Sequence, residues 1–285
     1  MEGKNLLFRT KKTLNLRGRL WAPEKPVVMG ILNTTPDSFY TGSRVATLDN
    51  ALRQTERMLT DGAAILDVGG YSTRPGADEV SEAIETDRVV PVIEAIMQHF
   101  PAAIISVDTF RPSVAEAAVQ AGALMVNDVS GGGDENMFDT VARLQVPYIL
   151  MHSRGTPQTM KQLTQYDDIL REILDFFIAR IQQLHKCGIK DVVIDPGFGF
   201  AKTIDQNYYL LKNLDYFRVL DLPILVGVSR KSMIYKRLNS TPAAALNGTT
   251  VLNTLALGKG ASILRVHDVK EAVESVKLYT LMAES

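Results

Sequence analysis

Residues 103–128, AIISVDTFRPSVAEAAVQAGALMVND, contain the pattern that decides the fold. One apolar run ends at Asp108 and a second ends at Asn127, and such continuous runs are typical of parallel strands buried on both faces. Pro112 and Gly122 bracket the segment between the two runs. Proline suits the first position of a helix, where the amide hydrogen has no partner, and glycine suits the residue after a helix. The stretch therefore predicts a strand, a helix and a second strand.

The same pattern recurs along the chain, and no linker rich in glycine, serine or proline interrupts it. Eight apolar runs alternate with helix-like segments: residues 27–32, 64–68, 103–107, 124–126, 148–151, 192–194, 224–228 and 263–266. Eight buried strands alternating with helices in roughly 250 residues predict an α/β fold, the (β/α)8 TIM barrel. A doubly wound open sheet is the alternative.

Several helices are predicted by apolar residues at three- and four-residue spacing. The clearest are residues 47–61, 81–99 and 163–187. Asp268 and Glu271 have the spacing of a capping box, in which the two side chains bond backbone amides at a helix start. We therefore expect the last helix to begin there.

The N-terminal region has a different pattern. In residues 13–21, Leu14, Leu16 and Leu20 alternate with polar residues, which predicts a short β-hairpin that closes the bottom of the barrel. The predicted organisation is an N-terminal segment with this hairpin over residues 1–24 and a single barrel domain over residues 25–285.

Composition excludes several classes of function. The 285 residues are 46% hydrophobic and carry a formal net charge of −1, so the basic excess typical of nucleic-acid binding is missing. No apolar run approaches the roughly 20 residues of a membrane span. The first 13 residues lack the apolar core of a signal peptide, and the single cysteine, Cys187, fits a reducing compartment. We expect a cytoplasmic protein without nucleic-acid or membrane partners.

Polar residues follow every predicted strand. In a barrel of this type the carboxyl ends of the strands meet at one rim, where active sites lie. Asp108, Asn127 and Asp195 are each plausible as a helix cap or turn residue when taken alone. Together on one rim, two carboxylates and a carboxamide suit a flat heterocycle with paired N–H donors, because a carboxylate accepts two parallel hydrogen bonds.

A cationic set lies on the same rim and predicts an anion site. Its members are Arg74, Lys231, Arg265 and His267. The last helix also presents its amide hydrogens there, as phosphate sites in barrels often require. Asn33 near phosphate oxygens would suit Mg²⁺, with Asp37 as a weaker candidate. His152 is expected to be a structural hydrogen-bonding residue, and no nucleophile motif is present.

These motifs resemble the dihydropteroate synthase family. The matching stretches are residues 29–39 (MGILNTTPDSF), 67–77 (DVGGYSTRPGA), 106–112 (SVDTFRP), 127–132 (NDVSGG), 151–160 (MHSRGTPQTM), 194–200 (IDPGFGF), 227–232 (GVSRKS) and 264–269 (LRVHDV). They occur in order and cover nearly all of residues 26–274.

The resemblance implies a reaction of folate biosynthesis that joins 6-hydroxymethyl-7,8-dihydropterin diphosphate to p-aminobenzoate and releases diphosphate. It also implies a homodimer that is a sulfonamide target. The pterin-binding residues would be Asp108, Asn127, Met151, Asp195, Lys231 and Arg265. The diphosphate-binding residues would be Asn33, which would also bind Mg²⁺, Thr73, Arg265 and His267. The p-aminobenzoate site would be bordered by Arg74, Pro75, Phe200, Lys231 and Ser232. The catalytic residues would be Asp108, Asp195, Lys231 and Arg265.

Two loop positions depart from the family pattern. Thr41 stands where the family usually has a second Asp in the first loop, and Tyr71 stands where it usually has Glu. Two other functions therefore stay open. One is a pterin-dependent methyltransferase, which would not need the residues that bind diphosphate. The other is a non-catalytic paralogue that binds pterin and has lost turnover.

Overall fold

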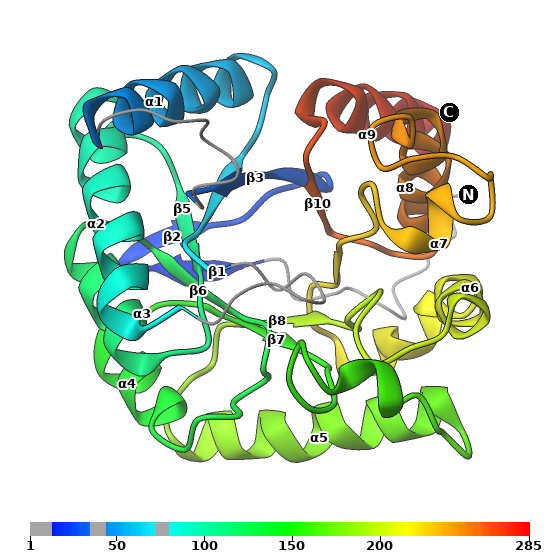
Figure 1. Ribbon diagram of the computed structural model, residues 1–285. Helices are drawn as coiled ribbons and strands as arrows, with labels where there is room; N and C mark the ends of the chain where they lie inside the picture. Colours follow the sequence, from blue (N-terminus) through cyan, green and yellow to red (C-terminus); the bar gives the residue numbers. More distant parts are fainter. Residues whose placement is uncertain (1–12, 35–43, 72–79) are drawn as a thin grey trace, which may run out of the picture.

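The protein is a barrel of parallel strands surrounded by helices (Figure 1). The computed structural model describes residues 13–34, 44–71 and 80–285. Within this part, eight parallel strands form one sheet in the order β8-β7-β6-β5-β4-β3-β10-β9. Their bounds are β3 (Val27–Asn33), β4 (Ile65–Gly69), β5 (Ile105–Asp108), β6 (Met125–Asp128), β7 (Tyr148–Met151), β8 (Val192–Asp195), β9 (Leu225–Val226) and β10 (Ile263–Val266).

The two edge strands of this sheet meet and close the ring. Ile194 of β8 forms an isolated parallel bridge with Ile224, which directly precedes β9. The backbone N–H of Ile194 donates to the carbonyl of Pro223 at 3.0 Å. The predicted (β/α)8 barrel is therefore confirmed, and the open-sheet alternative is wrong.

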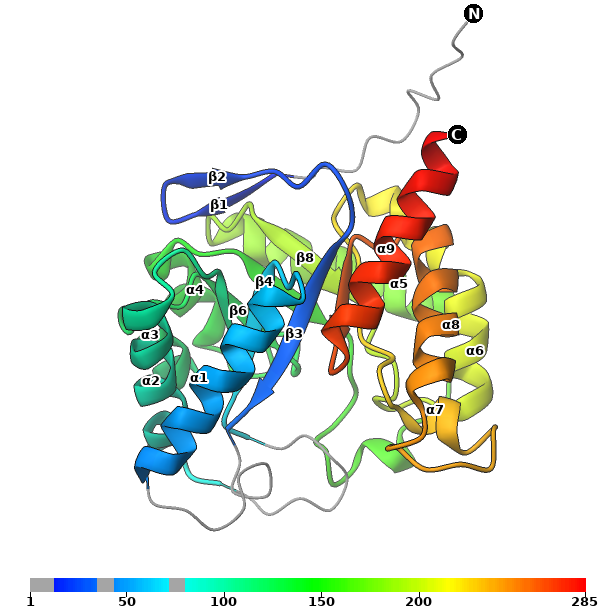
Figure 2. The same ribbon diagram turned by 90° about the horizontal axis from the view of Figure 1, so that it is seen from above.

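Helices cover the outside of the barrel (Figures 1 and 2). They are α1 (Arg44–Thr60), α2 (Glu82–His99), α3 (Pro112–Gln120), α4 (Met137–Leu144), α5 (Ile169–Lys186), α6 (Ile204–Lys212), α7 (Ser232–Tyr235), α8 (Leu246–Gly258) and α9 (Val269–Glu284). Within the described residues, two 3-10 helices, η3 (Met160–Gln162) and η4 (Leu214–Leu220), lie between α-helices in sequence. None of the described helices is long and apolar enough to cross a membrane.

The helix predicted over residues 163–187 begins later than expected. Asp168 is the N-cap of α5, and its side-chain oxygen accepts the backbone N–H of Arg171 at 3.2 Å. This bond satisfies one of the amides that a helix start leaves unpaired. Residues 163–167 belong to the connection between η3 and α5, so only the later part of the predicted segment is helical.

The inside of the barrel is layered. Successive side chains of a strand point to opposite faces, so residues two apart share a face. A floor of apolar side chains is formed by Met29, Ile65, Ile104, Met125, Ile149, Val193, Leu225 and Ile263. Two residues further along four of the strands stand Asp67, Asn127, Asp195 and Arg265. The strand period therefore places a polar layer directly above an apolar floor.

The N-terminal hairpin closes the floor from below. β1 (Leu14–Leu16) and β2 (Arg19–Trp21) pair antiparallel, and Leu14 and Leu16 are buried against the apolar floor. Figure 2 shows the hairpin across the end of the barrel where the strands begin. The predicted hairpin is present, and Leu20 of the alternating pattern is 71% exposed. The partly buried Trp21 of β2 packs against the same floor. The domain division between residues 24 and 25 stays a prediction.

Candidate active site

Arg265 is the centre of the polar layer. Its Nε donates to Asp67 Oδ2 at 2.6 Å, and its Nη2 donates to Asp108 Oδ2 at 2.5 Å. Asn127 Nδ2 donates to the same Asp67 oxygen at 3.0 Å. Strand register brings these groups together, because Asp108 of β5 pairs with Asn127 of β6 and Arg265 lies on β10, two strands from β4. The structure therefore brings together Asp108, Asn127 and Arg265, as predicted.

Asp67 is a central residue that the sequence analysis did not assign. Its side chain is fully buried, and within the described part of the chain its Oδ1 has no hydrogen-bond partner. Burying an unpaired carboxylate oxygen is costly, so a partner supplied by a ligand is the natural complement. The available signal was an aspartate inside the apolar run 64–68, since a charge in a buried strand must be paired.

The charges of this layer change each other's pKa values. Burial raises the pKa of Asp108 to about 7, although Arg265 opposes the change. Burial by itself lowers the pKa of Arg265, but Asp67 and Asp108 raise it by more. Arg265 is therefore always charged, whereas Asp108 changes its charge near neutral pH.

A second group of predicted residues lies at the ends of β7, β8 and β9. Asp195 is buried, and its Oδ1 accepts the backbone N–H of Gly197 at 2.8 Å. Met151 is buried beside it, in register with Asp195. Burial raises the pKa of Asp195, and the nearby charge of Lys231 opposes that rise. The bond from Gly197 thus holds one oxygen of this carboxylate in place.

Lys231 lies on the loop that follows β9. Its Nζ donates to the carbonyl of Phe198 and lies 4.7 Å from the centroid of the Phe200 ring. Burial lowers the pKa of Lys231 to about 8, and the charge of Asp195 opposes this. Ser232, the next residue, begins α7 and is half-buried. Phe200, Lys231 and Ser232 are therefore close in space or in sequence, as the predicted p-aminobenzoate site requires.

The ends of β9 and β10 are joined by side chains. Ser229 Oγ accepts the backbone N–H of His267 at 3.1 Å and lies 3.0 Å from His267 Nδ1. Since β9 pairs with β10 only at Leu225 and Val226, this contact extends the connection beyond the backbone ladder. It positions His267, a predicted phosphate ligand, at the barrel mouth.

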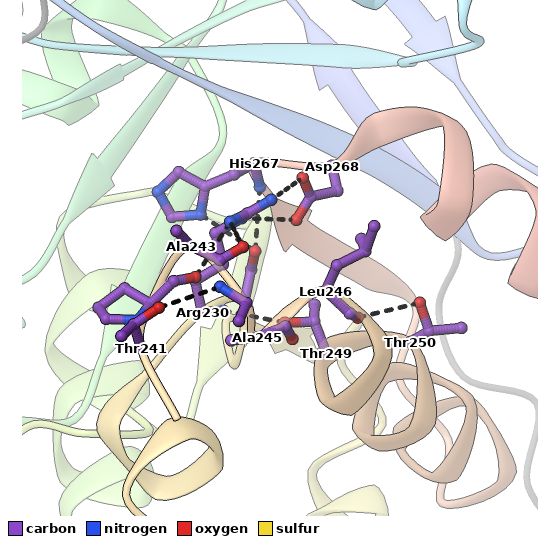
Figure 3. A network of polar contacts seen from close by, with 12 residues as sticks. Arg230, Thr241, Ala243, Ala245, Leu246, Thr249, Thr250, His267 and Asp268 are labelled. Carbon is purple, nitrogen blue, oxygen red and sulfur yellow. Dashed lines mark hydrogen bonds and ion pairs between the residues drawn. The ribbon is translucent and has the colours of Figure 1, made fainter. Parts of the chain in front are cut away.

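Arg230 makes the next connection (Figure 3). Its Nε and Nη2 donate to the two oxygens of Asp268 at 2.9 and 2.7 Å, and its Nη1 donates to the carbonyls of Pro242 and Ala243. The φ angle of Arg230 is 54°, in the left-handed region that non-glycine residues adopt mainly in turns. The bidentate pair engages Asp268, whose side chain makes no capping bond to α9. The predicted capping box is therefore wrong.

The remaining predicted residues are at the rim or outside the described chain. Asn33 ends β3 and is half-buried. Thr73, Arg74 and Pro75, together with Asp37 and Thr41, lie outside the described residues. Tyr71 is buried, and its ring meets Phe110 edge-on at 5.2 Å between centroids. This packing explains what Tyr71 does where the family usually has Glu.

The described residues fit a magnesium ion that is carried by a diphosphate. Among them, no group of three His, Cys, Asp or Glu side chains could hold a metal. Mg²⁺ keeps several waters and is often bound through one or two protein oxygens plus substrate phosphates. The amide oxygen of Asn33 at the mouth is a donor of the required kind.

Comparison with known proteins identifies the family. The family model described as "Pterin binding enzyme" matches residues 29–267. The chain belongs to the pterin-binding enzyme family. It is 44% identical over 255 residues to the dihydropteroate synthase of Escherichia coli (strain K12), covering 89% of this chain and 90% of that protein.

Solved structures of the pterin-binding enzyme family agree with this result. The dihydropteroate synthase of Yersinia pestis with a sulfonamide drug complex has a TM-score of 0.90 and 42% identity, covering 96% of this chain and 100% of that chain. The Xanthomonas albilineans dihydropteroate synthase with 4-aminobenzoic acid also has a TM-score of 0.90, at 39% identity, covering 96% and 99%. The resemblance stated from the sequence is confirmed, and so are the predicted dihydropteroate synthase function and the assignment as an enzyme.

Proposed function

We propose that this protein condenses 6-hydroxymethyl-7,8-dihydropterin diphosphate with p-aminobenzoate by a dissociative route, with the polar layer of the barrel as the pterin site. One observation carries the proposal. The buried carboxylates of Asp67 and Asp195 and the half-buried carboxylate of Asp108 lie above an apolar floor, and Arg265 forms ion pairs with Asp67 and Asp108. A flat ring with an amino group and ring N–H donors is complementary to such a group of carboxylates, because each carboxylate can accept two hydrogen bonds.

Asp195 is the residue best placed to read the amino-bearing edge of the pterin. Its Oδ1 is oriented by Gly197, and a carboxylate can accept two parallel hydrogen bonds from an amino group and an adjacent ring N–H. Asp67 Oδ1 and the amide of Asn127 supply further acceptors and donors on the facing strands. Met151 supplies apolar contact with the ring. These residues orient the pterin before any bond changes.

Diphosphate binds at the opposite side of the mouth. His267 is held by Ser229, and Arg265 lies two residues earlier, on β10. The amide hydrogens at the start of α9 add a positive dipole end, and the Asp268 carboxylate is neutralised by Arg230. With Asn33 as its protein ligand, Mg²⁺ would neutralise charge on the leaving diphosphate.

The chemical step breaks the bond between the pterin methylene carbon and the diphosphate oxygen. The diphosphate leaves with the bonding electron pair, and the methylene cation is conjugated with the dihydropterin ring. The amine nitrogen of p-aminobenzoate then forms the new C–N bond and releases one proton. Ionised Asp108 stabilises the positive charge, and Phe200 and Lys231 border the incoming arylamine.

The protein forms a homodimer through α8 and α9 in this proposal. Large apolar side chains are exposed on both helices, namely Val251, Leu255, Leu278, Leu281 and Met282. The two helices pack against each other, so these side chains share one face of the molecule. An apolar patch of this kind on a folded domain is typical of a protein–protein contact. We further propose that the dimer acts in the cytoplasm, which the single cysteine supports.

Replacing Leu278 with glutamate tests the dimer. A charge at the centre of an apolar contact opposes association, so Leu278→Glu should elute as a monomer with a light-scattering mass near 31.4 kDa. Val219→Glu is the matched control, because Val219 is 69% exposed on η4, outside the patch. A dimer that survives Leu278→Glu would place the interface elsewhere.

The activity is tested with purified protein, the dihydropterin diphosphate, p-aminobenzoate and Mg²⁺. We expect 7,8-dihydropteroate and diphosphate in equal amounts. Methylation of a corrinoid protein from methyltetrahydrofolate, without a pterin–arylamine product, would support the methyltransferase instead. Pterin binding by calorimetry without either product would identify a non-catalytic paralogue.

A further inference from the structure

Lys202 is a buried lysine that the proposed mechanism does not use. It lies between the loop after β8 and the start of α6, and its residue is only 8% exposed. Its Nζ donates to the carbonyls of Gly197 and Phe200, both at 3.0 Å. The same nitrogen lies 3.1 Å from His152 Nδ1, at the end of β7.

The environment of Lys202 provides one acceptor for each ammonium proton. Burial lowers the pKa of His152 well below its usual range, so the ring is neutral and Nδ1 can accept. Burial also lowers the pKa of Lys202 to about 7, while the charge of Asp195 opposes this. A buried ammonium group is costly even when it is fully hydrogen-bonded. The contacts of Lys202 with two carbonyls and a histidine ring therefore fix these three groups relative to one another.

Through these bonds Lys202 holds the loop of residues 196–200 in place. Gly197 has a φ of 73°, and a Cβ at this position would lie 1.9 Å from the carbonyl oxygen of His152. The loop therefore passes directly against the end of β7, and Lys202 bonds its backbone at both ends. Between the two bonded carbonyls lies the carbonyl of Phe198, which accepts Lys231 Nζ.

The loop also contacts two residues of the candidate site, Asp195 and Lys231. The N–H of Gly197 donates to Asp195, and the ring of Phe200 lies 4.7 Å from Lys231 Nζ. None of these contacts involves Lys202 itself. A change at Lys202 would therefore reach the substrates only through the loop.

We propose that Lys202 is a positioning residue that fixes the 196–200 loop so that Phe200 and Lys231 form the p-aminobenzoate site. The identity of that substrate rests on the proposed function. The clamp itself rests only on the contacts of Lys202. It acts mainly on the arylamine side, because Asp67, Asp108, Asn127 and Arg265 bond one another without help from this loop. On the pterin side the loop contacts Asp195, through the N–H of Gly197.

The test replaces Lys202 with methionine, an unbranched side chain one atom shorter that has no hydrogen-bond donors. Lys212→Met is the matched control, because Lys212 is an exposed lysine in the last turn of α6. Three quantities are measured: steady-state kinetics for each substrate, the dissociation constant of pterin-6-carboxylic acid by calorimetry, and amide hydrogen exchange by mass spectrometry.

We expect the KM for p-aminobenzoate to rise at least tenfold in Lys202→Met, while the pterin dissociation constant rises by a smaller factor, because the loop touches the pterin side only through the bond from Gly197 to Asp195. Peptides that span residues 196–200 should exchange at least tenfold faster, and peptides of β4–β6 should not change. Lys212→Met should match the parent in all three measurements. An unchanged KM with an unchanged loop would overturn the proposal, and so would an equal loss of both ligands with faster exchange throughout the barrel.

The test also covers two cases: a variant that does not fold and a parent protein that has no activity. If Lys202→Met does not fold, Lys202→Gln takes its place, because its shorter polar head cannot reach both carbonyls. If the parent protein makes no dihydropteroate, the proposed function fails, but loop exchange in the variant still tests the clamp. A loop that exchanges at the parental rate would then reject the clamp on its own.

Discussion

The two halves of the barrel rim hold their polar groups in different ways. In the strand half, Asp67, Asp108, Asn127 and Arg265 are strand residues that bond one another directly. In the loop half, Lys231 lies beyond β9 and is held by the loop of residues 196–200. The first half is ordered by strand register and charge, whereas the second depends on a backbone clamp. Mutations should therefore affect stability mainly in the strand half and substrate affinity mainly in the loop half.

The largest effect is expected from breaking the strand half at its centre. Arg265→Met leaves two buried carboxylates without their counter-charge, so the free energy of unfolding should fall by about 3–5 kcal/mol. Urea unfolding measures this. Arg237→Met is the control, because the pair with Asp205 is exposed and should contribute about 0–1 kcal/mol. A similar loss in both variants would show that the strand half has no special electrostatic coupling.

Asp195 lies where the two halves meet, and its replacement should affect binding more than folding. In Asp195→Asn an amide replaces the carboxylate, so the charge and one acceptor are lost. The affinity for a pterin should fall by about 2–5 kcal/mol in calorimetry, with the thermal midpoint close to that of the parent. Asp175→Asn on the exposed face of α5 is the control. Near-normal pterin affinity would remove Asp195 from the site.

The raised pKa of Asp108 predicts how stability and turnover depend on pH in the strand half. Its folded pKa is raised from 3.8 to about 7, so its protonated form stabilises the fold below pH 4 and this contribution is lost as the pH rises to 7. The unfolding free energy of the parent should therefore fall relative to Asp108→Asn between pH 5 and pH 8. Turnover of the parent should rise over the same range, because the ionised carboxylate stabilises the cation. A pH-independent difference between the two proteins contradicts this assignment.

The smallest effect is expected at the connection between Arg230 and Asp268. Asp268→Asn keeps one acceptor but loses the charge of the bidentate pair, so stability should fall by about 1 kcal/mol. The KM for the dihydropterin diphosphate should rise a few-fold, because His267 is the neighbouring residue. Asp215→Asn, in an exposed pair with Lys259, serves as the control. If the two variants have the same KM, the connection has no role in diphosphate binding.

The sequence predicted where several polar side chains of the candidate site lie, because the barrel places strand ends at one rim. Once eight buried strands are recognised, Asp108, Asn127 and Asp195 must lie on that rim whatever the loops do. The hairpin at the bottom was also predicted, since Leu14 and Leu16 alternate. Asp67 was open to prediction as a charge in a buried strand, but its partner on β10 is 198 residues away. The residues around Asp67 carry no pattern that predicts an ion pair with Arg265.

By itself, the sequence determined the repeated strand–helix unit, the apolar floor and the rim on which the polar residues lie. These depend on local periodicity and on the rule that strand ends of a closed barrel converge. Only the tertiary structure decided that Asp268 bonds Arg230 rather than caps α9, and that Lys202 and His152, which are 50 residues apart, clamp one loop. The physical reason is that a polar side chain has several local partners of nearly equal energy. The choice among them is made by distant groups that folding brings within hydrogen-bond distance.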